Sequence, residues 1–156
     1  MARSLLDEIK QTRPFNNPGA ETLVALLRTA HLVRRKGEEL FAEQGITMQQ
    51  YNVLRILRGA RAPLPTMEIA ERLIEPAPGI TRHVNNLEER GLLRREQWGG
   101  DRRCTLCQIT PAGLRLLETL DEPIDNWDKD ITRGLSDEQI AILLEALGVI
   151  RANLET

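Results

Sequence analysis

The stretch PGITRHVNNLEERG, residues 78–91, decides the fold, and the rest of the chain is interpreted outward from it. Its proline in the first turn and its glycine at the end predict one helix over residues 78–90. Apolar side chains recur at helical spacing on one face of that helix, and the opposite face carries Pro78, Arg82, Asn85, Asn86 and Glu89. Arginine and asparagine can pair bidentately with guanine and adenine edges in a major groove, so this helix is a candidate recognition element.

A shorter helix is expected just before it. Thr66 is the predicted cap of this helix, and Ile69, Ala70 and Leu73 are its predicted inward positions. The break EPAP at residues 75–78 then leads into the recognition candidate. Two short helices joined by a tight turn are typical of a helix-turn-helix motif.

A two-stranded hairpin is predicted directly after the motif. Residues 92–98 and 103–109 read as strands, and Gly99-Gly-Asp101 between them is a strong turn signal. Arg102 and Arg103 then lie at the tip of the hairpin, where they can enter a minor groove or contact phosphate. Helix, helix and hairpin together predict a winged helix-turn-helix.

Helices are predicted on the N-terminal side of the motif. Asn17 and Pro18 begin a helix that runs to about residue 43, long enough for part of its leucine-rich stripe to face a second subunit. The next helix begins at Thr47, with Gln50 completing a capping box, and is expected to close at Gly59. An extended connector over residues 63–65 follows, because two of its three residues are proline.

Two more helices are predicted after the hairpin. Thr110 caps the first of them, and Pro123 should kink or break it. Ser136 and Gln139 form a capping box that opens the last helix, whose apolar stripe continues almost to the terminus. A helix this apolar needs a partner surface, for which the long first helix is available.

The composition is that of one soluble globular domain. The chain has 156 residues, 41% of them hydrophobic and 28% charged, and no apolar run approaches the ~18 residues that span a bilayer. Its first residues are acidic where a signal peptide would be apolar, and its two cysteines suggest a reducing compartment. We therefore expect a cytoplasmic protein with no membrane partner.

Charge is unevenly distributed along the chain, although the net charge is only −2. Residues 77–103 carry six basic against four acidic side chains, whereas residues from 110 onward carry four basic against ten acidic ones. An arginine-bearing middle and an acidic end suggest one surface for a polyanion and another that is kept away from it.

Four segments in this order and spacing resemble the MarR (multiple antibiotic resistance) family of bacterial regulators. They are TMEIAERL at residues 66–73, PGITR and LEERGL within residues 78–92, DRR at residues 101–103 and ITPAG at residues 109–113. The resemblance extends over roughly residues 17–154. It implies a mainly α fold: a winged helix-turn-helix with a two-stranded β wing over residues 47–109, and dimerisation helices within residues 1–46 and 110–156.

The resemblance also implies a function, namely a homodimer in which each winged helix reads half of a pseudo-palindrome in double-stranded DNA, usually to repress transcription. Base and backbone contacts on the recognition helix map to Pro78, Thr81, Arg82, Asn85 and Asn86. In the wing, Asp101 is expected to organise the tip and Arg103 to enter the minor groove beside Arg102. The segment at residues 75–78 departs from the family pattern, since many members carry polar contact residues there.

Many relatives bind small aromatic acids between the dimer helices and the winged domain. The residues expected to line such a crevice here are His31, Arg35 and Tyr51, and either Trp98 or Trp127 could stack on an aromatic ring or simply fill core.

Other chemistries find little support. Cys104 and Cys107 point to opposite faces of a strand, and neither histidine is near them in sequence, so packing is a better explanation than a metal site. No cofactor is expected. The sequence contains no nucleophile–base pair or phosphate-binding glycine loop, which argues against an enzyme. The alternative function is a winged helix that binds protein instead of DNA, but Arg102 and Arg103 at the tip favour DNA.

Overall fold

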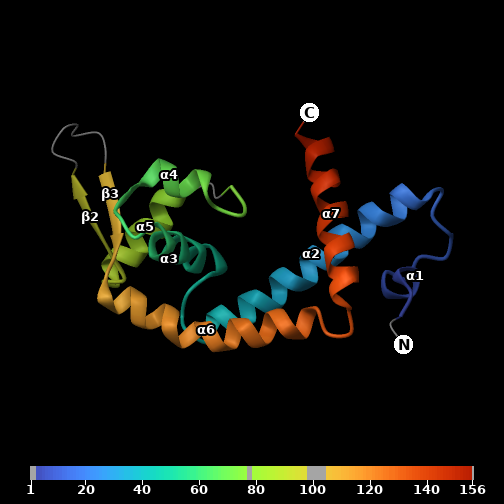
Figure 1. The fold of residues 1–156 in the computed structure, drawn as a ribbon, viewed down its shortest axis with the longest axis horizontal. Helices are drawn as coiled ribbons and strands as arrows, with labels where there is room; N and C mark the ends of the chain where they lie inside the picture. The colour runs from blue at the N-terminus through green and yellow to red at the C-terminus, as the bar shows by residue number, and fades with distance from the viewer. Residues whose placement is uncertain (1–2, 77–78, 98–104, 156) are drawn as a thin grey trace.

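The structure is a computed structural model that describes residues 3–76, 79–97 and 105–155. It is mainly helical with one small sheet (Figure 1). The elements in chain order are α1 (Leu5–Glu8), α2 (Pro18–Ala42), α3 (Met48–Ala60), β1 (Leu64–Pro65), α4 (Thr66–Glu71), α5 (Ile80–Glu89), β2 (Leu93–Gln97), β3 (Thr105–Ile109), α6 (Pro111–Ile131) and α7 (Asp137–Leu154). The winged helix-turn-helix region, α3 to β3, gathers at one end, while α2, α6 and α7 extend away from it.

Predicted helix starts are confirmed where a side-chain cap was expected, with one exception. Asn17, Thr47, Thr110 and Ser136 each accept a hydrogen bond from a backbone N–H in the first turn. Both predicted capping boxes are present, at the starts of α3 and α7. These contacts depend on residues within three positions of each other, which is why sequence alone finds them.

The exception is Thr66, whose predicted capping role is wrong. Pro65 occupies the N-cap of α4 and provides no side-chain hydrogen bond. The Thr66 hydroxyl instead lies 3.5 Å from the Cys107 sulfur on β3. A contact across the sheet has replaced a local one.

The sheet has three strands where two were predicted. Its order is β1-β3-β2, and both pairings are antiparallel. The predicted extended connector at residues 63–65 is extended, but Leu64 and Pro65 also pair with Cys107 and Leu106 as an edge strand. A proline is tolerated there because an edge strand needs no N–H on its outer side.

Two predicted helix ends are also corrected. α3 continues past Gly59 to Ala60, and Arg61 closes it in the left-handed conformation, at φ 56°. The break expected at Pro123 does not occur, since α6 is a single helix through that residue. Pro123 and Thr119 both lie on the exposed side of α6, so water can replace the backbone bond that proline removes.

One apolar core holds the winged region together. Its buried members come from α3, α4, α5, the sheet and α6: Val53, Leu54, Ile56, Leu57, Leu64, Ile69, Val84, Leu87, Leu92, Leu93, Cys107 and Leu117. A smaller cluster of Phe41, Ile46 and Leu120 joins α2 to α6, and the Phe41 ring stacks on Tyr51 with centroids 4.6 Å apart.

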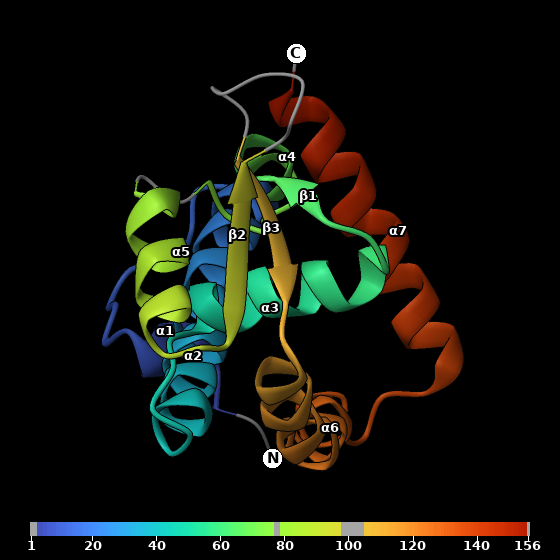
Figure 2. The same ribbon diagram turned by 90° about the vertical axis from the view of Figure 1, so that its left-hand side faces the viewer.

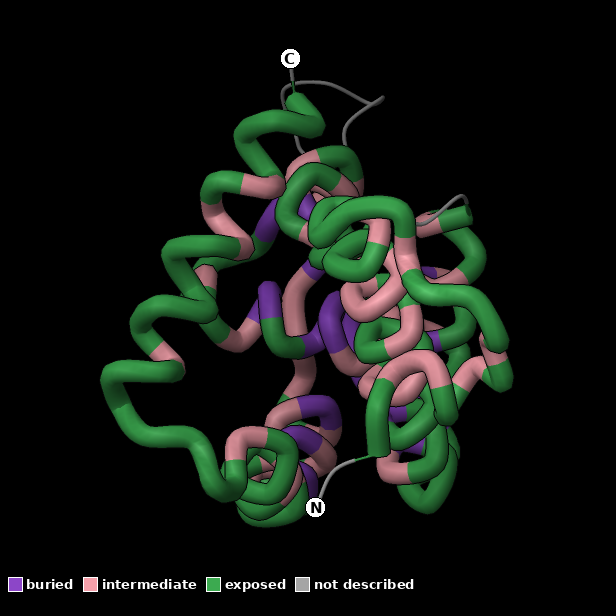
Figure 3. Tube along the Cα trace, turned by 90° about the vertical axis from the view of Figure 1, so that its right-hand side faces the viewer, coloured by how far each residue is buried: buried purple, intermediate pink, exposed green. Residues whose placement is uncertain are grey.

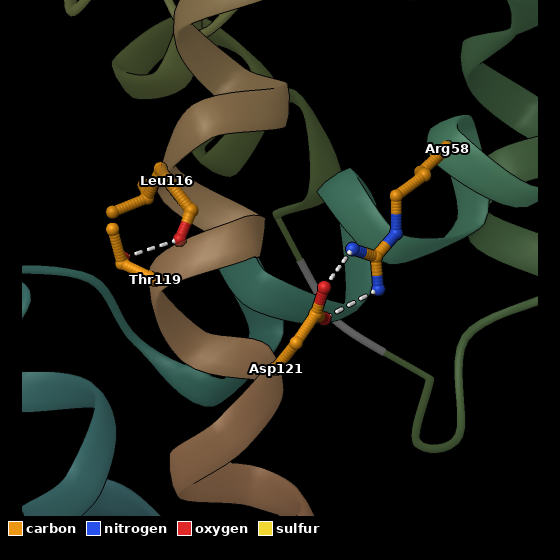
Figure 4. Close-up of polar contacts among 4 residues, drawn as sticks. All are labelled: Arg58, Leu116, Thr119 and Asp121. Carbon is orange, nitrogen blue, oxygen red and sulfur yellow. Dashed lines mark hydrogen bonds and ion pairs between the residues drawn. The ribbon is translucent and has the colours of Figure 1, made fainter.

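An ion pair adds a polar connection between α3 and α6 (Figure 4). The Arg58 guanidinium donates two hydrogen bonds to the Asp121 carboxylate, at 2.9 and 3.0 Å. These bonds raise the pKa of Arg58 above its usual value. The planar, bidentate geometry fixes the direction of α6 relative to the winged region.

The last helix, α7, is not packed in the same way. None of its residues is buried, and its exposed apolar side chains include Ile142, Leu143, Leu144, Val149 and Leu154 (Figure 3). Among the described residues it makes no extended contact with α2, the surface suggested for it by the sequence. Within the described part of the chain, no helix combines the length and hydropathy of a membrane span.

Candidate nucleic-acid interface

The recognition candidate is α5, which lies beside β2 on the outside of the winged region (Figure 2). It is shorter than predicted at both ends. It begins at Ile80 because Gly79 before it is in a left-handed conformation, at φ 97°, which favours glycine, and it ends at Glu89 with Arg90 as the C-cap. Val84 and Leu87 are fully buried and hold its inner face against the core. The predicted site residue Pro78 lies outside the described residues.

The outer face of α5 carries the other predicted contact residues. Thr81, Arg82 and Asn86 are exposed, and Asn85 is half-buried. Together with Gly79 and Glu89 they line a shallow open hollow. The structure therefore brings four of the predicted recognition-helix residues onto one solvent-facing surface.

The two asparagines differ in their surroundings. Asn86 accepts a hydrogen bond at its side-chain oxygen from the Gln50 amide nitrogen, at 2.7 Å. The side-chain oxygen of Asn85 is buried and has no hydrogen-bond partner among the described residues. Gln50 was recognised from the sequence only as a helix cap, and nothing in the sequence indicates its contact with residue 86.

Ion pairs hold α5 in place. Arg95 on β2 donates from its backbone and its guanidinium to the Glu88 carboxylate, with the closest side-chain contact at 2.5 Å. This contact lowers the pKa of Glu88 and raises that of Arg95. At the same C-terminal end of α5, the Arg90 guanidinium donates a hydrogen bond to the Gly45 carbonyl at 2.7 Å. The remaining strand arginine, Arg94, donates to Gln108 on the outer face of the sheet.

The wing tip lies outside the described residues, and with it Asp101, Arg102 and Arg103, as well as Trp98 and Cys104. The strands that lead to it are as expected, with Arg95 opposite Cys107 in the antiparallel register. Cys107 is fully buried, and burial raises the pKa of its thiol. No cluster of side chains suited to a metal ion occurs in the described part of the chain.

A cavity of about 290 Å³ lies between α2, α3, α6 and the segment that follows α4. Its lining is mainly apolar and comprises Ala30, Val33, Arg34, Phe41, Met48, Tyr51, Asn52, Ile74, Glu75 and Trp127. Of the residues predicted for a ligand crevice, Tyr51 lines this cavity, but His31 and Arg35 are exposed and do not. Helical spacing favours Arg34 over Arg35, because Arg34 follows Ala30 by four residues and precedes Phe41 by seven, on the face of α2 that lines the cavity.

A charged contact lies at this cavity. The Arg34 guanidinium is 2.5 Å from the Glu75 carboxylate, and both side chains are about half exposed. Glu75 belongs to the segment that connects α4 to α5. The pair therefore joins the long helix α2 to the connection that precedes the recognition candidate.

The fold and this surface define a winged helix-turn-helix protein. Comparison with known proteins gives the family: residues 44–103 match the model described as "MarR family". A crystal structure of a MarR transcription factor from Planctomyces limnophilus is 31% identical and superposes with a TM-score of 0.68, covering 87% of this chain and 99% of that one. The protein belongs to the MarR family and is a transcriptional regulator, not an enzyme.

Other relatives agree. The HTH-type transcriptional regulator PecS of Dickeya dadantii (strain 3937) is 28% identical over 132 residues, which is 83% of this chain and 79% of PecS. The S. aureus MepR–DNA complex has a TM-score of 0.75 at 23% identity, covering 83% of this chain and 96% of MepR. At that identity the similarity to MepR concerns the fold alone.

Proposed function

We propose that this protein binds pseudo-palindromic double-stranded DNA as a homodimer and represses transcription from the sites it occupies. The observation that carries the proposal is the solvent-facing row of Thr81, Arg82 and Asn86 on a helix whose other face is fully buried. A helix presented in this way can enter a major groove without disturbing its own packing. A regulator of this kind acts on DNA in the cytoplasm, where we place it.

The proposed contacts combine base edges with backbone. On α5 they are Thr81, Arg82, Asn85 and Asn86, with Pro78 before it in the sequence, and in the wing they are Asp101, Arg102 and Arg103. Arg82 is the principal candidate for base recognition, because its guanidinium is exposed at the first turns of the helix. Wing arginines would add affinity through the minor groove or the phosphates.

Uncovered apolar surface supports the homodimer. Leu143 and Leu144 on α7 are 47% and 62% exposed, and Leu23 and Leu27 on α2 are 58% and 64% exposed. Monomeric proteins rarely leave such leucine-rich faces in water, since burying apolar surface contributes roughly 25 cal/mol per Å². A second copy of the chain would cover these faces and hold two α5 helices for successive major grooves.

DNA binding is tested by substituting the proposed contacts. Arg82→Ala should cost about 1–3 kcal/mol of discrimination between a selected duplex and random DNA. Arg103→Ala should lower affinity for both and flatten the salt dependence. Titrations at several salt concentrations measure both effects, with the exposed Arg115→Ala on α6 as the control. Unchanged binding in both variants would contradict the site, and a monomer that binds no duplex at low salt would favour a protein-binding module.

The cavity between α2 and the winged region supports a small aromatic effector with an acidic group. Its apolar lining suits an aromatic ring. The carboxylate of the effector could bind the Arg34 guanidinium, either beside Glu75 or in its place. Loss of the Arg34–Glu75 contact would free the segment that precedes α5. A ligand in the cavity could thereby displace α5 and lower the affinity for DNA.

This effector proposal has a built-in control in two adjacent arginines. Isothermal titration with a panel of phenolic acids should detect binding that Arg34→Ala abolishes and that Arg35→Ala leaves unchanged, because only Arg34 lines the cavity. Tyr51→Ala should also weaken it. Equal losses in the two arginine variants would place the ligand elsewhere, and no heat from any acid would reject this ligand class.

A further inference from the structure

The orientation of the Gln50 side chain is determined by the start of α3. The Gln50 side-chain oxygen lies 2.9 Å from the Thr47 backbone nitrogen, and a backbone N–H can only donate. The oxygen of the Gln50 amide must therefore face Thr47. Its nitrogen, which can only donate, is directed to the other side.

That nitrogen determines the orientation of Asn86 in turn. Gln50 is 7% exposed, so its amide is held within the protein, and it donates to the Asn86 side-chain oxygen at 2.7 Å. If the Asn86 amide were flipped, two N–H groups would face each other. Asn86 itself is exposed on the outer face of α5. Its oxygen is therefore turned toward the protein, where Gln50 uses one of its two lone pairs, and its NH₂ group is the amide end turned away from Gln50.

This arrangement restricts which bases the helix can recognise. Bidentate recognition of adenine by asparagine requires the amide oxygen to accept from N6 and the amide nitrogen to donate to N7. The Asn86 oxygen is directed to Gln50, which misplaces it for a bidentate pair with one base, and the Asn85 side-chain oxygen is buried. The third long side chain, Arg82, carries a guanidinium that can only donate. Arg82 and Asn86 therefore present donors on this face, whereas the carboxylate of Glu89 can only accept.

We propose that Gln50 is a positioning residue that turns the Asn86 oxygen inward, so that Asn86, like Arg82, contacts hydrogen-bond acceptors and does not read adenine bidentately. The acceptor is a major-groove base acceptor, such as guanine O6 or N7, or a phosphate oxygen. This inference rests on the proposed function, since it requires α5 to contact DNA. It extends the site to a residue on α3 that does not itself face the duplex.

The proposal predicts that the contribution of Asn86 depends on residue 50. Gln50→Glu keeps an oxygen for the Thr47 cap but cannot donate, so Asn86 should turn its nitrogen inward and its oxygen outward. Gln50→Met removes the donor without adding charge and leaves Asn86 free to rotate. The cost of Asn86→Ala should therefore be about 3- to 10-fold in affinity with glutamine at position 50, smaller after Gln50→Met, and absent or reversed after Gln50→Glu.

The experiment is a set of double-mutant cycles on a duplex selected by the wild-type protein from a random-sequence library. Each cycle measures the cost of Asn86→Ala twice, once with Gln50 and once with the substituted residue 50. Effects of the residue-50 substitution on overall charge or on the helix cap are the same with and without Asn86, so they cancel. Thermal melting checks that each variant folds. If the Gln50→Glu variant does not fold, the Gln50→Met cycle alone tests whether the cost of Asn86→Ala depends on residue 50. Gln139→Glu, the same change in the capping box of α7, should leave the cost of Asn86→Ala unchanged.

The outcomes separate clearly. A loss confined to one base position, and unchanged when any adenine N6 amino group there is removed, identifies a base acceptor. A loss equal across sequences identifies phosphate, and both results support the proposal when coupled to residue 50. Equal costs of Asn86→Ala in all backgrounds would overturn it. So would a loss confined to an adenine that disappears when the N6 amino group is removed from the duplex. If the wild-type protein selects no duplex, the proposed function itself fails, and this inference with it.

Discussion

The winged region and α7 make opposite use of apolar side chains. In the winged region, twelve side chains from helices and strands form one buried cluster. In α7, an 18-residue helix rich in leucine and isoleucine, no residue is buried. The two regions begin their helices in the same way, because α3 and α7 both start with a capping box. Local chemistry forms both helices, but only one of them finds a surface to cover within the chain.

The stability of the winged region and that of α7 should therefore respond differently to protein concentration. The winged region buries its apolar surface by itself, so its stability should not change with protein concentration. The apolar faces of α7 and the start of α2 remain uncovered in one chain, so their contribution should depend on assembly. Three predictions follow this comparison, in decreasing order of expected effect.

Removing a leucine from each region should separate them most clearly. Leu54 is fully buried in the winged core, so Leu54→Ala should lower the free energy of unfolding by about 2–5 kcal/mol at every concentration. Leu144 is 62% exposed, so Leu144→Ala should act only through the dimer and shift the melting temperature most in dilute samples. Denaturation at several concentrations measures both. A concentration-independent loss of equal size in the two variants would contradict the comparison.

Two glycines provide the next test. A methyl group on Gly113 would lie 2.2 Å from the Leu92 carbonyl oxygen, which is backbone and cannot move aside. Gly113→Ala should therefore cost about 1–3 kcal/mol or more, because α6 would be forced away from β2. Gly59 lies near the end of α3 with open space around it, so Gly59→Ala should be neutral or stabilise by about 0.5–1 kcal/mol. Urea unfolding distinguishes the two, and equal effects would refute the close approach of α6 to β2.

The smallest effect is expected from the ion pair that fixes α5. Arg95 lowers the pKa of Glu88, so the pair stabilises the fold fully above the usual glutamate pKa and loses that contribution as the pH falls through the lowered value. Glu88→Gln should cost under about 1 kcal/mol at neutral pH, and the difference from wild type should vanish in acid. Glu89→Gln, an exposed neighbour, is the control. A cost that persists at low pH would point to packing instead of charge.

The sequence predicted features that depend on near neighbours. Thr47 with Gln50, and Ser136 with Gln139, are in place because each capping box is closed within three residues. The polar face of α5 also follows from its helical period, which puts Arg82 and Asn86 on the side opposite Val84 and Leu87. The placement of Asp101, Arg102 and Arg103 stays a prediction.

Several of the predictions that failed involve partners far away in the chain. Thr66 was predicted as a cap but faces Cys107, 41 residues later, and Leu64 forms a strand only because β3 lies beside it. The cavity is lined by Arg34 rather than Arg35; helical spacing puts Arg34 on the face of Ala30 and Phe41, but packing decides that this face of α2 meets α3. No local pattern contains this information.

By itself, the sequence determined where helices begin, which of their faces are apolar, and that α5 presents arginine and asparagine to solvent. These properties depend on backbone geometry and hydrogen bonds that span a few residues. Only the tertiary structure decided that Gln50 would hold the oxygen of Asn86, that Arg34 would meet Glu75, and that α7 would remain uncovered. Each of these depends on the distance between segments that lie far apart in the chain, which packing sets and periodicity does not.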